Sequence, residues 1–184
     1  HSETHNKSGM TVASLVRWRY ASAVAYASLD QRISHVAVTG IVTPTIAAQI
    51  LRDNAAWLRR SGALAQVASY ENAVLALNSE ELLSSALRAT PDGLDVPTSL
   101  HIAPHQYSLI SAYSTLMAQH GIGRMPATSY GLALDWAQRQ ALVRYSMRLR
   151  RQDGSGSTAS STGAPGSDHP ADLQTDAPSH EPQD

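Results

Sequence analysis

Two histidines, His101 and His105, are the residues of this sequence best placed to do chemistry. They lie on either side of Pro104, at the end of a short apolar stretch that includes Leu100, Ile102 and Ala103, and Tyr107 follows. Ligands of open α/β sheets bind beyond the carboxyl ends of the strands, and the end of this stretch is such a position. His101, His105 and Tyr107 are therefore candidate ligand-binding residues. Helix capping and ordinary surface placement explain the two histidines equally well.

The same two imidazoles could hold a metal ion only with a third ligand. Asp95 and His35 are two residues of suitable type, but nothing in the spacing requires a shared metal. His35 lies in an apolar, alternating segment, where we expect a half-buried side chain with a satisfied hydrogen bond. We therefore predict no metal site and no cofactor.

Other residue patterns that support catalysis are missing from the sequence. It has no cysteine, which excludes disulfides, thiol nucleophiles and thiolate metal sites. It has no G-x-S-x-G turn for a serine nucleophile, and the single G-x-G at Gly121 and Gly123 follows a predicted helix instead of beginning one. Glu80 and Glu81 are adjacent, so they point in different directions on a helix. The sequence therefore disfavours an enzyme.

The strongest electrostatic feature is a basic face near the end of the last predicted helix. Such a face could contact nucleic acid, anionic lipid or an acidic protein. Aromatic residues that would stack on bases are few there, namely Trp136 and Tyr145, so nucleic-acid binding is the weaker alternative. The basic face consists of Arg139, Arg144, Arg148, Arg150 and Arg151.

Helix start and stop signals are well defined in the first half of the chain. Thr43 followed by Pro44 is typical of a helix start, and Gly62 after two arginines is typical of a helix end, so a long helix is predicted between them. Asn78, with Glu81 three positions later, resembles a capping box and predicts a second, shorter helix.

The apolar segments between these helices predict strands. Residues 15–29 can form one long strand or two with a break near Ala21, and residues 33–39 alternate, which together predict a β-hairpin. Residues 73–77 fit either a strand or the lead into a helix. Residues 98–140 indicate strand, helix, strand and helix, an order that belongs to a partly parallel sheet. We predict a two-layer α/β fold with a mixed β-sheet and helices packed mainly on one face.

Composition divides the chain into one domain, residues 10–152, and two flanking segments. Residues 1–9 are expected to be an added leader without structure, with Met10 as the native start. The domain holds thirteen arginines and eight acidic residues, whereas residues 153–184 hold six acidic residues, no lysine or arginine and one large aliphatic residue, Leu173. Such a tail cannot bury enough apolar surface to fold, so we expect it to be disordered; it could cover the basic face or only aid solubility.

Two motifs in this domain resemble the STAS-like family, named after sulfate transporters and anti-sigma-factor antagonists. They are the VTG-x-VTP turn at residues 38–44 and the segment GIGRMPATSYGLALDWA at residues 121–137, with its Ala133 and Trp136 pair. The resemblance extends over residues 14–140 and is nearest to uncharacterised bacterial stand-alone proteins. It implies an α/β domain that regulates a partner.

The resemblance also implies a phosphorylation site. In anti-sigma-factor antagonists, a serine that follows an aspartate at the start of the second helix is a phosphorylated switch. The matching position here is Ser79, which follows Asn78 in place of the aspartate. A helix N-terminus would stabilise a phosphate on Ser79, but Glu80 and Glu81 would repel it.

The leading interpretation is a bacterial, cytoplasmic, non-enzymatic regulatory or protein-interaction module whose protein partner is unknown, with a homodimer left open. No apolar run approaches the ~18–20 residues that cross a bilayer, so we expect no transmembrane segment. The alternative is a small-molecule or lipid-binding protein with a pocket near Pro104. Nucleic-acid binding through the basic face is a weaker alternative.

Overall fold

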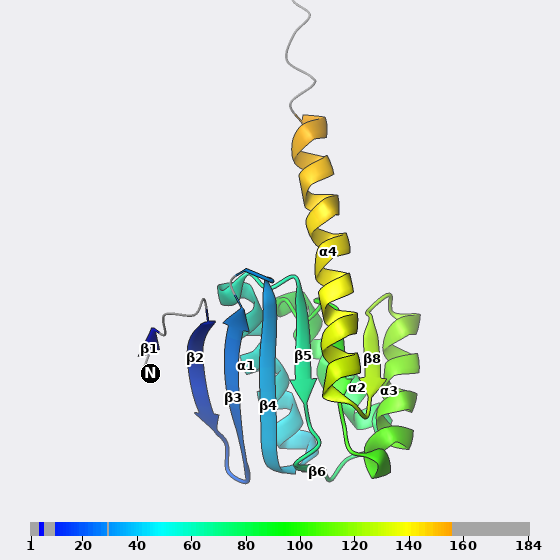
Figure 1. Ribbon diagram of the computed structural model, residues 1–184. Helices are drawn as coiled ribbons and strands as arrows, with labels where there is room; N and C mark the ends of the chain where they lie inside the picture. Colours follow the sequence, from blue (N-terminus) through cyan, green and yellow to red (C-terminus); the bar gives the residue numbers. More distant parts are fainter. Residues whose placement is uncertain (1–3, 6–9, 29, 156–184) are drawn as a thin grey trace, which may run out of the picture.

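A mixed β-sheet forms the centre of the protein (Figure 1). The computed structural model describes residues 4–5, 10–28 and 30–155, and side chains over 16–28 and 30–154. Within these residues, eight strands form one sheet in the order β1-β2-β3-β4-β5-β7-β8, with β6 also beside β4. Strands β1 to β4 pair antiparallel, and β4, β5, β7 and β8 pair parallel. The strands are β1 Thr4–His5, β2 Met10–Arg17, β3 Ala21–Ser28, β4 Ile33–Val42, β5 Ala65–Ser69, β6 Ala73–Leu75, β7 Thr98–His101 and β8 Arg124–Ala127.

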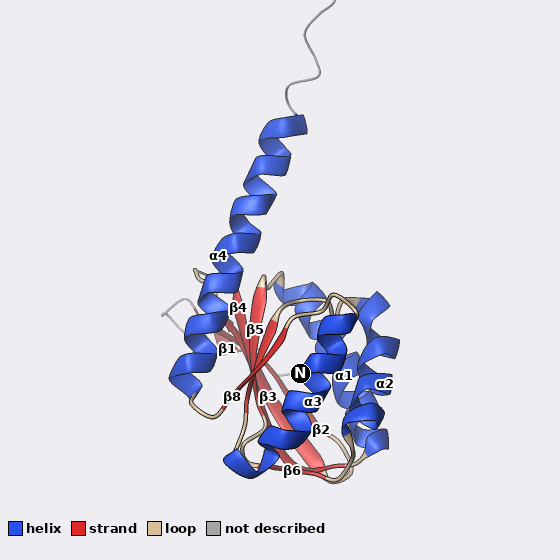
Figure 2. Cartoon of the chain, turned by 90° about the vertical axis from the view of Figure 1, so that its right-hand side faces the viewer, coloured by secondary structure: helices blue, strands red, loops and turns tan. Residues whose placement is uncertain are grey.

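Helices cover the two faces of the sheet unequally (Figure 2). Helices α1, α2 and α3 lie on one face, and α4 lies alone on the other. The predicted α/β fold, with a mixed sheet and helices mainly on one face, is confirmed, and α4 adds a partial third layer. The α-helices are α1 Pro44–Ser61, α2 Ser79–Ala89, α3 Tyr107–Gln119 and α4 Tyr130–Ser155, and short 3-10 helices form at Thr90–Asp92 and Pro104–Gln106.

The predicted start and end of α1 and the predicted start of α2 are confirmed by their caps. Thr43 accepts a hydrogen bond from the backbone N–H of Ile46, and Gly62 ends α1 in the left-handed conformation. At α2, the Asn78 side chain accepts from the N–H of Glu81, and the Glu81 side chain accepts from the N–H of Asn78. These caps satisfy backbone groups that a helix end leaves unpaired.

The predicted β-hairpin is also confirmed, as β3 and β4, and residues 15–28 contribute to two strands, β2 and β3, and not to one. Strand β3 pairs with β4 from Ala21 opposite Gly40 to Ser28 opposite Ile33. The chain reverses between β2 and β3 because the N–H of Trp18 donates to the carbonyl of Ala21. The ambiguous segment at residues 73–77 begins as strand β6.

Two segments differ from their sequence-based expectations. Strand β1 lies at Thr4–His5, within the leader expected to have no structure. Helix α4 continues to Ser155, past the expected start of the tail at residue 153. Residues 1–3, 6–9 and 156–184 lie outside the described residues, so the rest of the leader and tail predictions stay predictions.

Small side chains bring α4 close to the sheet. Ala133, Ala137 and Ala141 recur every four residues, so they form one face of the helix, and all three are buried. They pack against apolar residues of β4, β5 and β8 such as Ile33 and Val67. Beyond Ala141 the helix leaves the sheet and projects from the body of the protein (Figure 1).

Candidate functional site

The projecting half of α4 carries large apolar side chains that the rest of the described chain does not cover. Every residue from 145 to 154 is exposed, as are Leu142 and Val143. Leu142 is 67% exposed and Met147 is 56% exposed. Large exposed apolar residues gathered on one element are typical of an interaction surface, whereas single ones are ordinary. The whole set is Leu142, Val143, Tyr145, Met147 and Leu149.

Three of these residues form a continuous stripe, which we name the α4 seam: Leu142, Tyr145 and Leu149. Their spacing of three and four residues places them on one side of the helix. The seam leads into a groove of about 620 Å³ between α4 and the turn from β3 to β4, where Leu142 and Tyr145 face Ile33 and Leu64. The guanidinium of Arg32 lies over the Tyr145 ring, 5.3 Å from its centroid. The seam and groove together form a surface on which a helix can pack.

The structure distributes the predicted basic face along the same helix. Arg139 forms an ion pair with Asp135 one turn earlier, at 2.6 Å. Arg144 makes a long contact of 3.5 Å to the carbonyl of Leu64. The other three arginines, Arg148, Arg150 and Arg151, lie on the exposed projecting half. The positive charge is therefore concentrated beside the α4 seam.

His101 lies at the carboxyl end of β7, where the sequence analysis expected a ligand. It is buried, and the register of the parallel strands places it beside Ser69 of β5. Its Nδ1 lies 2.9 Å from the Ser69 hydroxyl, and its Nε2 lies 3.4 Å from a carboxylate oxygen of Glu71. The Tyr130 ring packs edge-on against the imidazole, 5.5 Å between centroids. Serine, histidine and glutamate are thus joined in one chain of contacts, which the sequence analysis missed.

His35 lies next to this cluster; it is hydrogen-bonded, as expected, but it is buried and not half-buried. Its Nδ1 is 2.7 Å from the Tyr130 hydroxyl, and its ring stacks on Tyr26 with centroids 4.5 Å apart. Burial lowers the pKa of His35 below its ordinary value. Burial, helped by a hydrogen bond with Tyr26, raises the pKa of Tyr130. Both effects favour the uncharged forms.

His105 and Tyr107 do not take part in this cluster. The 3-10 turn at Pro104–Gln106 leads the chain away from the sheet, and both side chains are exposed. The buried residue of this turn is Gln106, whose amide donates to the carbonyls of Tyr70 and Ala73. Of the three predicted ligand-binding residues, the structure places only His101 in a polar cluster. Among the described residues, no group of three or more metal-ligating side chains gathers in one place.

Ser79 lies in the first turn of α2, at the position that the family resemblance indicates. Its hydroxyl donates to the carbonyl of Leu109 in α3, at 3.0 Å. A phosphate on Ser79 would remove this donor and would lie beside Glu80 and Glu81. Phosphorylation of Ser79 stays a prediction.

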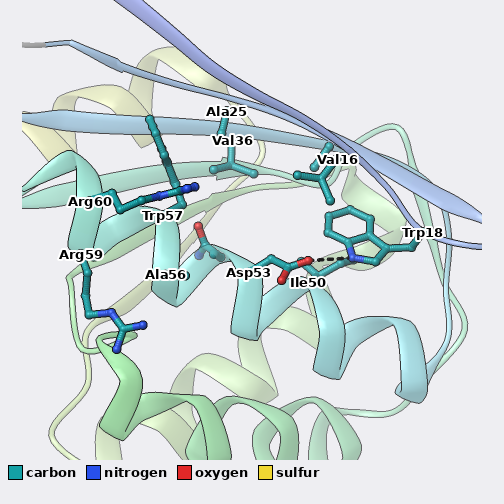
Figure 3. Close-up of a pocket in the computed structure, with 12 residues that line it drawn as sticks. Val16, Trp18, Ala25, Val36, Ile50, Asp53, Ala56, Trp57, Arg59 and Arg60 are labelled. Atoms are coloured by element: carbon teal, nitrogen blue, oxygen red, sulfur yellow. Dashed lines mark hydrogen bonds between the residues drawn. The ribbon is translucent and has the colours of Figure 1, made fainter. Parts of the chain in front are cut away.

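An apolar cavity of about 570 Å³ lies between α1 and the strands β2, β3 and β4 (Figure 3). It is lined by residues such as Trp18, Ala25 and Trp57, none of which the sequence analysis singled out. These residues are distant in the sequence, and only the pairing of β2 with β3 and the packing of α1 bring them together. The cavity is separate from Pro104, which was the predicted position of a pocket.

No family model matches the chain, and no curated protein matches its sequence. The resemblance to STAS-like domains therefore stays a prediction. Within the part of the chain that the structure describes, no helix combines the length and apolar character needed to cross a membrane.

Proposed function

We propose that this protein is a non-enzymatic protein-interaction module that docks through the α4 seam, and that its partner there is a second copy of the chain. The observation that carries the proposal is the exposure of Leu142, Tyr145 and Leu149 on a helix that projects from the body (Figure 1). Burying three such side chains stabilises a complex, because each removes apolar surface from water. A regulatory role would follow from control of this pairing.

The spacing along α4 favours a second helix of the same kind. Residues three and four apart form the contact line of paired helices. In an antiparallel pair with its two-fold axis near Tyr145, Leu142 of one copy meets Leu149 of the other, so each copy makes the same contacts. The distal end of the partner helix then reaches the groove at the base of α4, where Ile33 and Leu64 provide apolar contacts.

Charge is compatible with a second copy. The distal end of α4 holds Arg148 and Arg150, and the groove at its base includes one charge of each sign, Asp30 and Arg32. In an antiparallel pair, Asp30 is the groove residue to which the arginines of the other copy can pair. The sequence after α4 contains five acidic residues and no lysine or arginine, which offsets the repulsion between two basic helices.

The polar residues of the sheet support a non-enzymatic role. His101 is held by Ser69 and Glu71, and His35 is held by Tyr130. These contacts connect β5 to β7 and β4 to α4. The Tyr130 ring of α4 also packs against the rings of His35 and His101. The cluster is best understood as a connection between α4 and the parallel strands.

Sedimentation of the full-length protein over a range of concentrations tests the proposal. We expect a dimer that dissociates on dilution, and a monomer for the double variant Leu142→Glu, Leu149→Glu at the same concentrations. The matched control, Val24→Glu with Val74→Glu, adds the same charge at exposed apolar residues outside α4 and should dimerise as the unmodified protein does. A monomer at every concentration overturns the proposal.

Cysteine cross-linking then tests the antiparallel arrangement, because the natural chain has no cysteine. A mixture of Leu142→Cys and Leu149→Cys should form the mixed disulfide in preference to either symmetric one, and Tyr145→Cys should cross-link to itself. Preferential cross-linking of Leu142→Cys to itself would contradict this register. Binding of a DNA duplex by the protein would favour a nucleic-acid-binding function instead. That binding should weaken steeply with salt and be lost in the double variant Arg148→Gln, Arg150→Gln.

A further inference from the structure

The cavity between α1 and the antiparallel strands has the dimensions of a ligand site. It is partly open to solvent, on the side where the exposed Asp53, Arg59 and Arg60 lie, and its volume of about 570 Å³ falls within the ~300–1,000 Å³ of small-molecule sites. One wall is α1, with Ile50 and Trp57, and the opposite wall is the sheet, with Ala25 and Val36 (Figure 3).

Small residues on β3 create this space. Side chains alternate along a strand, so Ala21, Ala23, Ala25 and Ala27 all point to the face that α1 covers. All four are buried, and Ala23 and Ala25 line the cavity. Larger residues at these positions would fill the gap between helix and sheet, as apolar side chains do beneath α4.

The polar groups around the cavity are nearly all paired within the protein. The indole N–H of Trp18 donates to Asp53 at 3.0 Å, and that of Trp57 donates to Ser34 at 2.8 Å. Asn54 and Gln66 exchange two hydrogen bonds through their side-chain amides. With their N–H groups engaged, the two tryptophans present ring surfaces to the cavity. The interior therefore suits an apolar body.

Arg59 and Arg60 are the exceptions, because neither side chain makes a hydrogen bond or ion pair with any described residue. Arg60 is exposed, and its side chain extends along the cavity (Figure 3). Arg59 also borders the cavity but points away from it, and its aliphatic chain packs beside Gly93. An uncommitted guanidinium beside an apolar cavity is suited to a carboxylate, which it can hold with two parallel hydrogen bonds.

We propose that this cavity binds a small amphipathic carboxylate, with its apolar part between Trp18 and Trp57 and its carboxylate at Arg60. The site lies on α1 and the antiparallel strands, so it is independent of the α4 seam. The apolar part could be an alkyl chain or an aromatic ring, since ring surfaces and aliphatic walls accept both.

Calorimetric titration of the full-length protein tests this proposal with four probes: decanoate, 2-naphthoate and their uncharged counterparts decanol and 2-naphthol. We expect at least one carboxylate to bind about tenfold more tightly than its alcohol, which is the order expected of one charge-assisted hydrogen-bonded pair. The better carboxylate of the two identifies the apolar part as alkyl or aromatic. No binding by either carboxylate overturns the proposal, and so does equal binding of acid and alcohol.

Variants localise the binding. Arg60→Ala should lose the preference for the carboxylate and keep the affinity for the alcohol, while Arg52→Ala, an exposed arginine on another side of α1, should bind as the unmodified protein does. Ala25→Leu should abolish binding by filling the cavity, and Ala23→Val serves the same purpose if the leucine variant does not fold. Unchanged binding in folded Arg60→Ala, or in a folded cavity-filling variant, overturns the assignment.

Discussion

The hydroxyl of Tyr130 lies 2.7 Å from Nδ1 of His35, which joins the first turn of α4 to the start of β4. The ring of Tyr26 stacks on the same imidazole, so β3, β4 and α4 meet at His35. The contact anchors the start of the helix whose far end carries the α4 seam. Its strength depends on pH, because one of its members is a histidine.

Stability should fall in mild acid because of His35. Burial lowers its pKa in the folded protein, so the unfolded chain binds the proton first as the pH decreases. The stability contribution of His35 is therefore complete above the ordinary histidine pKa of 6.5 and is lost as the pH falls below it. Urea unfolding at pH 7.5, 6.5 and 5.5 measures this effect. We expect His35→Gln to flatten the decrease and His105→Gln, at an exposed site, to keep it. An unchanged slope in His35→Gln would contradict the assignment.

Arg124 should be one of the most destabilising positions to change. Its buried guanidinium donates to the carbonyls of Leu94, Val96 and Gly123 at 2.7–2.9 Å, which holds the loop before β7 against β8. Arg124→Met leaves these acceptors unpaired and should lower the free energy of unfolding by about 2–4 kcal/mol. Arg139→Met breaks only an exposed pair within one helix and should cost less than about 0.5 kcal/mol. Chemical denaturation compares the two, and equal effects would refute this account of Arg124.

Most of the fold could be predicted because its signals are local. Thr43 and Pro44 mark the start of α1, and Gly62 marks its end. Asn78 and Glu81, which are three residues apart, mark the start of α2. Segments without such signals were less certain. Strand β6 is short, and its partners in β4 are more than 30 residues away in the sequence. Its apolar sequence alone therefore could not show whether it forms a strand or the segment that leads into α2.

The functional surfaces were less predictable because they depend on distant contacts. Ser69 and His101 meet only through the register of β5 and β7. The cavity forms only where the fold brings Trp18 and Trp57 together. The sequence around each tryptophan gives no sign that it lies near the other one. The basic end of α4 could be read directly from the sequence. Its exposed apolar seam could not, because an apolar stripe on a predicted helix is normally expected to be buried.

Gly40 should tolerate no side chain. Its φ is +94°, and a Cβ there would meet the carbonyl oxygen of Tyr20 and lie 2.8 Å from the Cα of Ala21. Gly40→Ala must therefore both strain its own backbone and displace the turn between β2 and β3. We expect a loss of about 3 kcal/mol or more in the free energy of unfolding. Gly62→Ala is the control, because Gly62 also has a positive φ but no atom lies within 4 Å of its Cβ position. Its cost should be about 1 kcal/mol, and a larger loss at Gly62 than at Gly40 would contradict the steric argument.

Hydrogen exchange should divide α4 at Ala141. Amides of residues 133–141 belong to a segment packed on the sheet, whereas the side chains of residues 145–154 are all exposed and none of them belongs to the apolar core. A helix end of this length is marginal by itself, so the amides of residues 145–154 should exchange at least tenfold faster than those of residues 133–141 in dilute solution.

If two copies pair through the α4 seam, raising the protein concentration should slow exchange in residues 145–154 and leave residues 133–141 unchanged. The double variant Leu142→Glu, Leu149→Glu should show no such slowing. Distal protection that is independent of concentration would mean that something within the chain, and not a second copy, covers the seam.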